Sequence, residues 1–241
     1  MLVKSLGIVL RTFKYNDTQN IVDVYTEAMG RVSFMVRIPR SRRATIKNVL
    51  FQPMAVLLLE WNARPTIQLQ KVQTVKSAIP FSSIPYNQNK LSIALFLSEF
   101  LCGALREEQH NSSMFQYILM SIEWFDGCTD RCANFHLVFL LRLSQFLGFY
   151  PNLDQYHQGA YFDLLSSCFV DKQPLHHHYV NPTDACHLPL LMRMRYETLH
   201  KFVFSRQERE RLLSVINDYY RLHIPSFPQL KSLEVLKEVF G

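Results

Sequence analysis

The chain has 241 residues, 48% of them hydrophobic, which allows one large domain or two small ones with a substantial core. Its 7 glycines and 11 prolines exclude a collagen-like or low-complexity chain. No uncharged apolar stretch approaches the roughly 18 residues of a membrane span, and residues 1–13 do not have the pattern of a signal peptide. The number of cysteines, five, is odd, which argues against the disulfide framework of a secreted protein. We therefore expect a cytoplasmic protein that does not contact a membrane.

The positive charge is concentrated in the first third of the chain. The whole chain has a net charge of +6, whereas residues 1–80 hold 12 basic and 4 acidic residues, a net charge of +8. The remaining 161 residues therefore carry a net charge of −2. A localised excess of this kind is typical of a protein that binds a polyanion.

The first eighty residues have the pattern of a β-rich domain. Their alternating apolar runs are separated by turns, and Gly30 can adopt the positive φ that a tight hairpin needs. Five short strands in this length predict a small closed barrel. The expected strands cover residues 6–11, 21–26, 31–36, 53–61 and 66–75.

The period of a strand assigns its side chains to faces. Within residues 31–37, Val32, Phe34 and Val36 are expected to point into the barrel. Arg31 and Arg37 then share the outer face.

Helical spacing begins after residue 80, where a polar segment over residues 81–88 predicts a domain boundary. We expect domain 1–80 to be the barrel and domain 81–241 to be helical, with an irregular insertion at about 148–182. This organisation is an α+β, multi-domain fold. The expected helices include residues 91–105, 112–125, one from Thr129 or Asp130 through the apolar run 137–141, one from Pro182, 206–222 after a capping box, and 232–240.

A basic loop follows the third expected strand. Residues 37–47 contain five bases and no acid, and each base could neutralise one phosphate. A solvated loop without function is the alternative. The five bases are Arg37, Arg40, Arg42, Arg43 and Lys47.

Exposed aromatic rings would be the second requirement for single strands, because any base can stack on a ring. Phe13, Tyr15 and Tyr25 lie near basic residues. Packing in the core or at the rim of the barrel is the favoured interpretation of each ring taken singly.

Histidines and cysteines gather in and after the irregular segment, at positions 168, 176–178, 186 and 187. Zinc sites usually contain a close pair of ligands such as Cys-x-x-Cys, and the chain has none. A histidine-rich surface loop is therefore favoured over a zinc site, and we expect no metal and no cofactor. Phosphate-binding glycine loops and nucleophile motifs are also missing, so we expect no enzyme; a metal-assisted enzyme is kept as an alternative.

Three segments resemble one known family. The first is Ile8-Val9-Leu10-Arg11-Thr12 followed by residues 21–32, which include Thr26-Glu27-x-x-Gly30. The second covers residues 141–153 and the third covers residues 231–236. In this order they resemble recombination protein O (RecO), across nearly the whole chain. Many members carry a four-cysteine zinc site after the second segment, but residues 154–157 replace its first pair here, so the resemblance implies a degenerate zinc site.

The resemblance implies an OB-fold barrel and a function in DNA repair and homologous recombination. Proteins of this family bind single- and double-stranded DNA and anneal complementary strands. They act with RecR, and often RecF, to load RecA onto DNA coated by single-stranded-DNA-binding protein (SSB). Several contact the acidic C-terminal tail of SSB through the helical domain, and Arg142 lies in the matching helix, although a surface base is the favoured interpretation of it.

Combining charge, pattern and resemblance, we predict a DNA-binding recombination mediator. A protein-interaction scaffold with incidental DNA affinity is the alternative. The predicted DNA-binding residues are Arg11, Lys14, Arg31, Arg37, Arg40, Arg42, Arg43 and Lys47.

Overall fold

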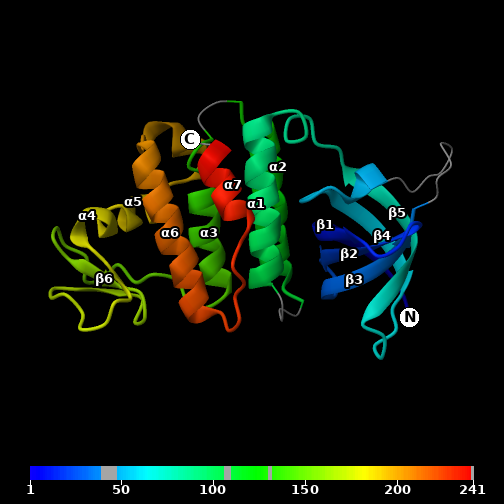
Figure 1. Cartoon of the computed structure of the whole chain (residues 1–241), viewed down its shortest axis with the longest axis horizontal. Helices are drawn as coiled ribbons and strands as arrows, with labels where there is room; N and C mark the ends of the chain where they lie inside the picture. Colours follow the sequence, from blue (N-terminus) through cyan, green and yellow to red (C-terminus); the bar gives the residue numbers. More distant parts are fainter. Residues whose placement is uncertain (39–47, 106–109, 130–131, 240–241) are drawn as a thin grey trace. The chain divides into compact units, whose positions relative to one another are not determined.

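The computed structural model describes residues 1–38, 48–105, 110–129 and 132–239 (Figure 1). The chain divides into two compact units, residues 1–127 together with 230–239, and residues 128–229. The first unit therefore contains helices as well as strands. The predicted boundary near residue 80 lies inside this unit and remains a prediction about domain organisation.

The first unit contains the closed five-stranded barrel that the sequence predicts (Figure 1). The strand order is β1-β2-β3-β5-β4, and all neighbours are antiparallel except β3 and β5. Gly30, with φ of 69°, closes the turn between β2 and β3. The strands are β1 (Leu2–Lys14), β2 (Gln19–Thr26), β3 (Gly30–Arg37), β4 (Val56–Asn62) and β5 (Leu69–Ile79), with the short 3-10 helix η1 (Asn48–Phe51) before β4.

The barrel closes because β1 pairs with two strands, β2 and β4. Residues 2–8 of β1 pair with β4, and residues 7–14 pair with β2. At Gly7, one of the two shared positions, a Cβ would lie only 2.5 Å from Val24 Cγ1 and 2.7 Å from Leu59 Cδ1. A larger residue here would have to displace these side chains. Inside the barrel, Phe34 meets Trp61 edge to face at 5.2 Å between ring centroids.

Three helices complete the first unit: α1 (Gln88–Ala104), α2 (Ser112–Gly127) and α7 (Ser232–Val239). The hydroxyl of Ser98 on α1 donates a hydrogen bond to the carbonyl of Leu10 on β1. The carboxylate of Glu99 accepts hydrogen bonds from the N–H groups of Lys231 and Ser232, at 3.1 and 2.8 Å. α1 is thus attached both to the barrel and to the start of α7.

The segment expected to be a polar linker is bound to α2. Asp126 at the end of α2 accepts hydrogen bonds from the N–H groups of Ser82, Ser83 and Ile84, at 2.7, 2.9 and 2.8 Å. A single carboxylate therefore fixes three consecutive main-chain donors. This attachment explains why the compact unit extends past residue 80.

The second unit is built around α3 (Phe135–Phe146), whose residues 137–141 are all buried as predicted. This helix begins at Phe135, later than the predicted Thr129 or Asp130; before it, Cys128 and Cys132 form a disulfide, and the N–H of Phe135 donates to the carbonyl of Cys132. The capping box at Ser205 confirms the predicted start of a long helix. The other helices are α4 (Pro182–Ala185), α5 (Leu188–Arg193), the 3-10 helix η2 (Tyr196–Lys201) and α6 (Arg206–His223).

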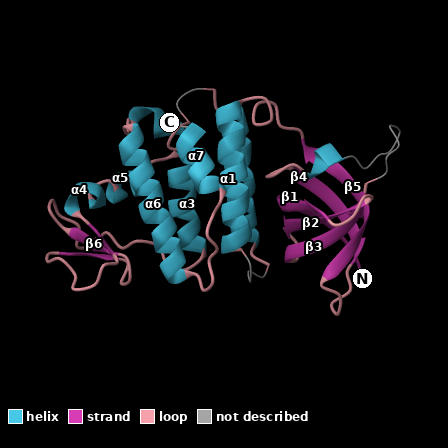
Figure 2. Cartoon of the chain, viewed as in Figure 1, coloured by secondary structure: helices cyan, strands magenta, loops and turns pink. Residues whose placement is uncertain are grey.

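The segment predicted to be irregular contains a small sheet (Figure 2). It consists of β6 (Tyr161–Asp163), β7 (Cys168–Val170) and β8 (Tyr179–Val180), in the order β7-β6-β8. Strands of two or three residues are too short to show an alternating pattern in the sequence. Of the helices in the described ranges, none is long and apolar enough to cross a membrane.

Candidate nucleic-acid interface

An apolar row crosses the outer face of three barrel strands, β1, β2 and β3. The strand register places Phe13 opposite Ile21, Ile21 opposite Met35, and Met35 beside Lys71. Cross-strand partners point to the same side of a sheet. Phe13 is 41% exposed, Ile21 and Met35 are half-buried, and Lys71 is exposed. We call Phe13, Ile21 and Met35 the apolar row; it ends at a cation.

A charged network occupies the next row of the same face. The buried carboxylate of Asp23 lies 2.7 Å from Arg11 Nη2 and 3.0 Å from Arg31 Nη2, and the Ser33 hydroxyl donates to it at 2.5 Å. Burial acts to raise the pKa of Asp23. The hydrogen bond from Ser33 and the charges of Arg31 and Arg11 outweigh burial and hold the pKa below its ordinary value of 3.8.

The two arginines of this network differ in their access to solvent. The Arg31 side chain is only 16% exposed and also donates to the carbonyl of Cys102 on α1, at 2.8 Å. The charge of Arg31 is therefore compensated by groups of the protein itself. The alternation of side chains along the strand could not show this. Arg11 is 56% exposed and lies over the ring of Phe13, with its Cζ 5.0 Å from the ring centroid.

The other two described bases of the predicted set are exposed. Lys14 lies 2.7 Å from Asp17, but both side chains are more than half exposed, so the pair is worth less than about 1 kcal/mol and can open. Arg37, at the end of β3, has no ion-pair partner among the residues that the structure describes. Arg40, Arg42, Arg43 and Lys47 lie outside the described residues.

A hollow of about 390 Å³ lies at this end of the barrel. Phe13, Lys14, Asn20, Ile38 and Asn48 are among its lining residues. The hollow therefore places an exposed ring and an exposed cation together.

The three aromatic candidates are placed differently. Phe13 and Tyr15 are exposed, at 41% and 59%, although Arg11 lies over the ring of Phe13. Tyr25 is fully buried and packs against Phe115, with ring centroids 6.0 Å apart. Tyr25 is therefore a core residue, in line with the interpretation favoured for it.

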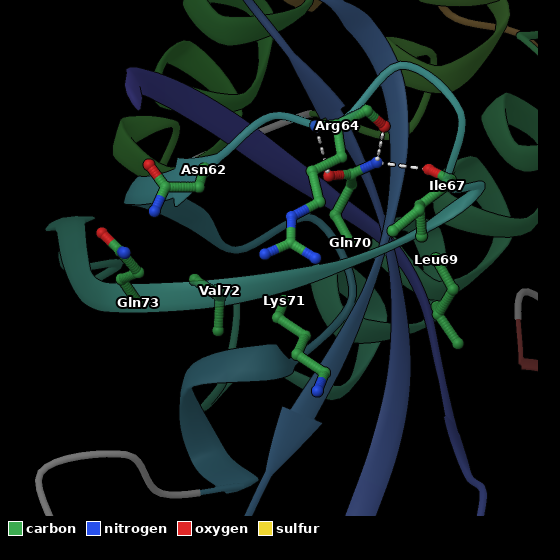
Figure 3. Close-up of a pocket in the computed structure, with 8 residues that line it drawn as sticks. All are labelled: Asn62, Arg64, Ile67, Leu69, Gln70, Lys71, Val72 and Gln73. Carbon is green, nitrogen blue, oxygen red and sulfur yellow. Dashed lines mark hydrogen bonds between the residues drawn. The ribbon is translucent and has the colours of Figure 1, made fainter. Parts of the chain in front are cut away.

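Two of the barrel bases outside the predicted set line a common cavity. Arg64 in the turn between β4 and β5, and Lys71 on β5, are exposed and line one cavity (Figure 3). In the sequence, Arg64 lies between the expected strands 53–61 and 66–75 and Lys71 lies within the second of them. The only sequence feature that pointed to DNA binding by these two residues was their position in the strongly basic first third of the chain.

Arg142 is bound within the second unit. Its Nη2 donates to the carbonyl of Met194, and its guanidinium lies over the ring of Tyr196, 5.6 Å from the centroid. These contacts give Arg142 a structural role, and they leave its predicted contact with a partner's tail as a prediction.

Two histidines of the second unit form separate pairs with acids. His157 Nε2 lies 2.8 Å from Asp171, and His176 Nε2 lies 3.4 Å from Asp163. Over the described ranges, no three His, Cys, Asp or Glu side chains are grouped so that they could hold a metal ion.

Comparison with known proteins identifies the family. The family profile described as "Recombination protein O N terminal" matches residues 1–81, and that described as "Recombination protein O C terminal" matches residues 86–234. The chain belongs to the recombination protein O family. The chain is also 56% identical to the DNA repair protein RecO of Bacteroides fragilis and 53% identical to that of Phocaeicola vulgatus, over the whole length of each chain. The RecO of Porphyromonas gingivalis is 32% identical, also over its whole length.

Membership confirms the resemblance seen in the three sequence segments. The RecO family consists of recombination mediators without enzymatic activity. The barrel described above is the part matched by the N-terminal profile. Its outer face is thus the candidate interface of a DNA repair family.

Proposed function

We propose that this protein is a recombination mediator that acts in DNA repair in the cytoplasm. It binds single- and double-stranded DNA, anneals complementary strands, and helps to load RecA onto SSB-coated DNA together with RecR and RecF. The curated relatives named DNA repair protein RecO support this proposal.

The apolar row beside exposed cations is the observation that carries the proposal. Phe13, Ile21 and Met35 offer bases an apolar surface, and Arg11, Lys14 and Arg37 border it. Single-strand binders combine stacking surfaces with a basic groove in this way.

Charge neutralisation explains how such a face would anneal strands. Two DNA strands repel each other, and bases that neutralise phosphates lower this repulsion. The basic loop with Arg40, Arg42, Arg43 and Lys47 extends the charge beyond the described residues. Arg31 no longer belongs to the proposed contacts, because its guanidinium is held by Asp23 and Cys102.

The test is binding to a fluorescent single-stranded oligonucleotide over a salt series. We expect Arg40→Ala, Arg42→Ala and Arg43→Ala together to weaken binding at every sequence alike. The log–log salt slope should fall by about 0.7 for each lost phosphate contact. Lys172, Arg193 and Lys201, changed together to Ala in the second unit, form the charge-matched control.

An unchanged slope in the loop variant would contradict the role of the loop. Wild-type protein that binds DNA only at very low salt would contradict the whole proposal and favour the scaffold function. Annealing of complementary oligonucleotides, measured by energy transfer between their labels, should fall in parallel with binding.

A further inference from the structure

The turn between β4 and β5 carries a cavity of about 380 Å³, which we call the hairpin pocket (Figure 3). This volume lies within the range of ligand pockets, roughly 300–1,000 Å³. The lining residues that matter here are Arg64, Ile67, Leu69, Gln70, Lys71 and Val72. All of them come from one hairpin of the barrel.

The backbone of β5 explains why consecutive side chains line one cavity. A regular strand sends neighbouring side chains to opposite faces, yet Lys71, Val72 and Gln73 all line the pocket. The register passes from Glu60↔Thr74 to Trp61↔Val72, so Gln73 is an extra, bulged residue. A bulge redirects side chains at the rim of a barrel, and here it turns them toward the cavity.

The pocket has a fixed wall. Gln70 is only 9% exposed, and its side-chain amide donates to the carbonyls of Arg64 and Ile67 and accepts from the N–H of Arg64. The turn that carries Arg64 is therefore held before any ligand arrives. A site that is already ordered pays less conformational entropy on binding.

The charges at the pocket are available to a ligand. In Figure 3 the side chain of Arg64 reaches toward β5, and that of Lys71 extends from β5 in the direction away from the Arg64 guanidinium; both residues line the cavity. Within the described part of the barrel, neither has a carboxylate partner, whereas Lys4 lies 3.2 Å from Glu60 and Arg11 lies 2.7 Å from Asp23. Two cations without a carboxylate partner on one cavity favour the binding of an anionic ligand.

The remaining lining narrows the class of ligand. Ile67, Leu69 and Val72 give the pocket apolar walls, which inorganic phosphate would leave unused. A nucleotide has both parts, because its phosphates match Arg64 and Lys71 and its base matches an apolar wall. Bases in a duplex are stacked inside the helix, so only a single strand can offer one.

The occupant is a strand of DNA because the pocket adjoins the apolar row. Lys71 pairs with Met35 across the β3–β5 seam, and Met35 is the last residue of that row. A strand lying along Phe13, Ile21 and Met35 would therefore reach Lys71 next. We infer that the hairpin pocket holds one nucleotide of bound single-stranded DNA, with its phosphates at Arg64 and Lys71 and its base against Ile67, Leu69 and Val72. This inference rests on the proposed function.

The first test removes the two pocket cations. We expect Arg64→Ala with Lys71→Ala to weaken binding to a fluorescent oligothymidylate by about tenfold and to lower the salt slope by about 1.4, two phosphates at about 0.7 each. Lys4→Ala with Lys76→Ala removes the same charge from the same barrel outside the pocket and should leave the slope nearly unchanged. Circular dichroism and thermal melting show that each variant is folded.

The second test separates the base from the phosphates. Ile67→Ser places a hydroxyl on the apolar wall and should weaken binding to oligothymidylate more than binding to an abasic oligonucleotide of equal length. Thymidine monophosphate at millimolar concentration should not displace the oligonucleotide, because one nucleotide lacks the contacts with the apolar row. Displacement by the free nucleotide would overturn the assignment to a strand.

Failure of the inference is distinguishable from failure of the proposed function. If the wild-type protein binds no single-stranded DNA, the proposed function fails. If the wild-type protein binds and the two double variants behave alike, the hairpin pocket is overturned while DNA binding by the barrel stands.

Discussion

The side chain of Gln70 is hydrogen-bonded to both main-chain polar groups of Arg64. The N–H of Arg64 donates to Gln70 Oε1 at 3.1 Å, and Gln70 Nε2 donates to the Arg64 carbonyl at 2.9 Å. The nearly buried side-chain amide of Gln70 on β5 thus makes the hydrogen bonds that a main-chain partner would make at this end of the hairpin. The position of Arg64 over the cavity depends on this pair.

We predict that Gln70→Ala lowers the free energy of unfolding by about 1–3 kcal/mol, because it removes the three part-buried hydrogen bonds that its side chain makes with the main chain of Arg64 and Ile67. The melting temperature should fall by roughly 2–4 °C for each kcal/mol. Urea denaturation measures the change. The exposed, bulged Gln73 supplies the control, since Gln73→Ala should stay within about 0.5 kcal/mol of wild type. Equal stability of the two variants would contradict the role of Gln70.

A second prediction concerns Asp23, which holds two arginines. Asp23→Ala leaves the guanidinium of Arg31 inside the protein without its carboxylate, so we expect a loss of about 2–4 kcal/mol in the free energy of unfolding. Arg11→Ala removes a half-exposed partner and should cost less than about 1 kcal/mol. Guanidinium denaturation of both variants makes the comparison. A larger loss of unfolding free energy for Arg11→Ala than for Asp23→Ala would show that the exposed arginine, and not the buried carboxylate, contributes most to the stability of the network.

The barrel could be predicted from the sequence because its signals are local. Alternating side chains, a glycine at position 30 and turns between apolar runs are read within a few residues. The same pattern correctly placed Arg31 and Arg37 on one face. It could not distinguish the two, because Arg31 is held by Cys102, 71 residues along the chain, while Arg37 has no such partner in the described part of the chain.

The hairpin pocket could not be predicted from the sequence. Its lining depends on a bulge at Gln73 and on parallel pairing between β3 and β5, which joins Met35 to Lys71. Neither the extra residue nor the pairing partner has a signature in one sequence. The basic loop was visible as a run of charge, whereas two cations brought together by folding were not.

The last prediction uses the carboxylate of Asp126. Burial acts to raise its pKa, but hydrogen bonds from the main chain of Ile84, Ser82 and Ser83 lower it from 3.8 to about 2. A carboxyl whose pKa is lower in the folded protein stabilises it above the unfolded pKa. This stabilisation is complete well above pH 3.8 and is lost as the pH falls toward 2.

Asp126→Asn should therefore destabilise the protein at pH 7 and not at pH 2. We expect a loss of about 1–2 kcal/mol at pH 7, a figure reduced because the side chain is partly exposed and screened by solvent. Urea denaturation between pH 7 and 2 should show the variant and wild type converging below pH 3.8. Asp154→Asn, at an exposed carboxylate in the second unit, provides the control. A difference that stayed constant with pH would mean that packing, and not the charge of Asp126, holds residues 82–84 to α2.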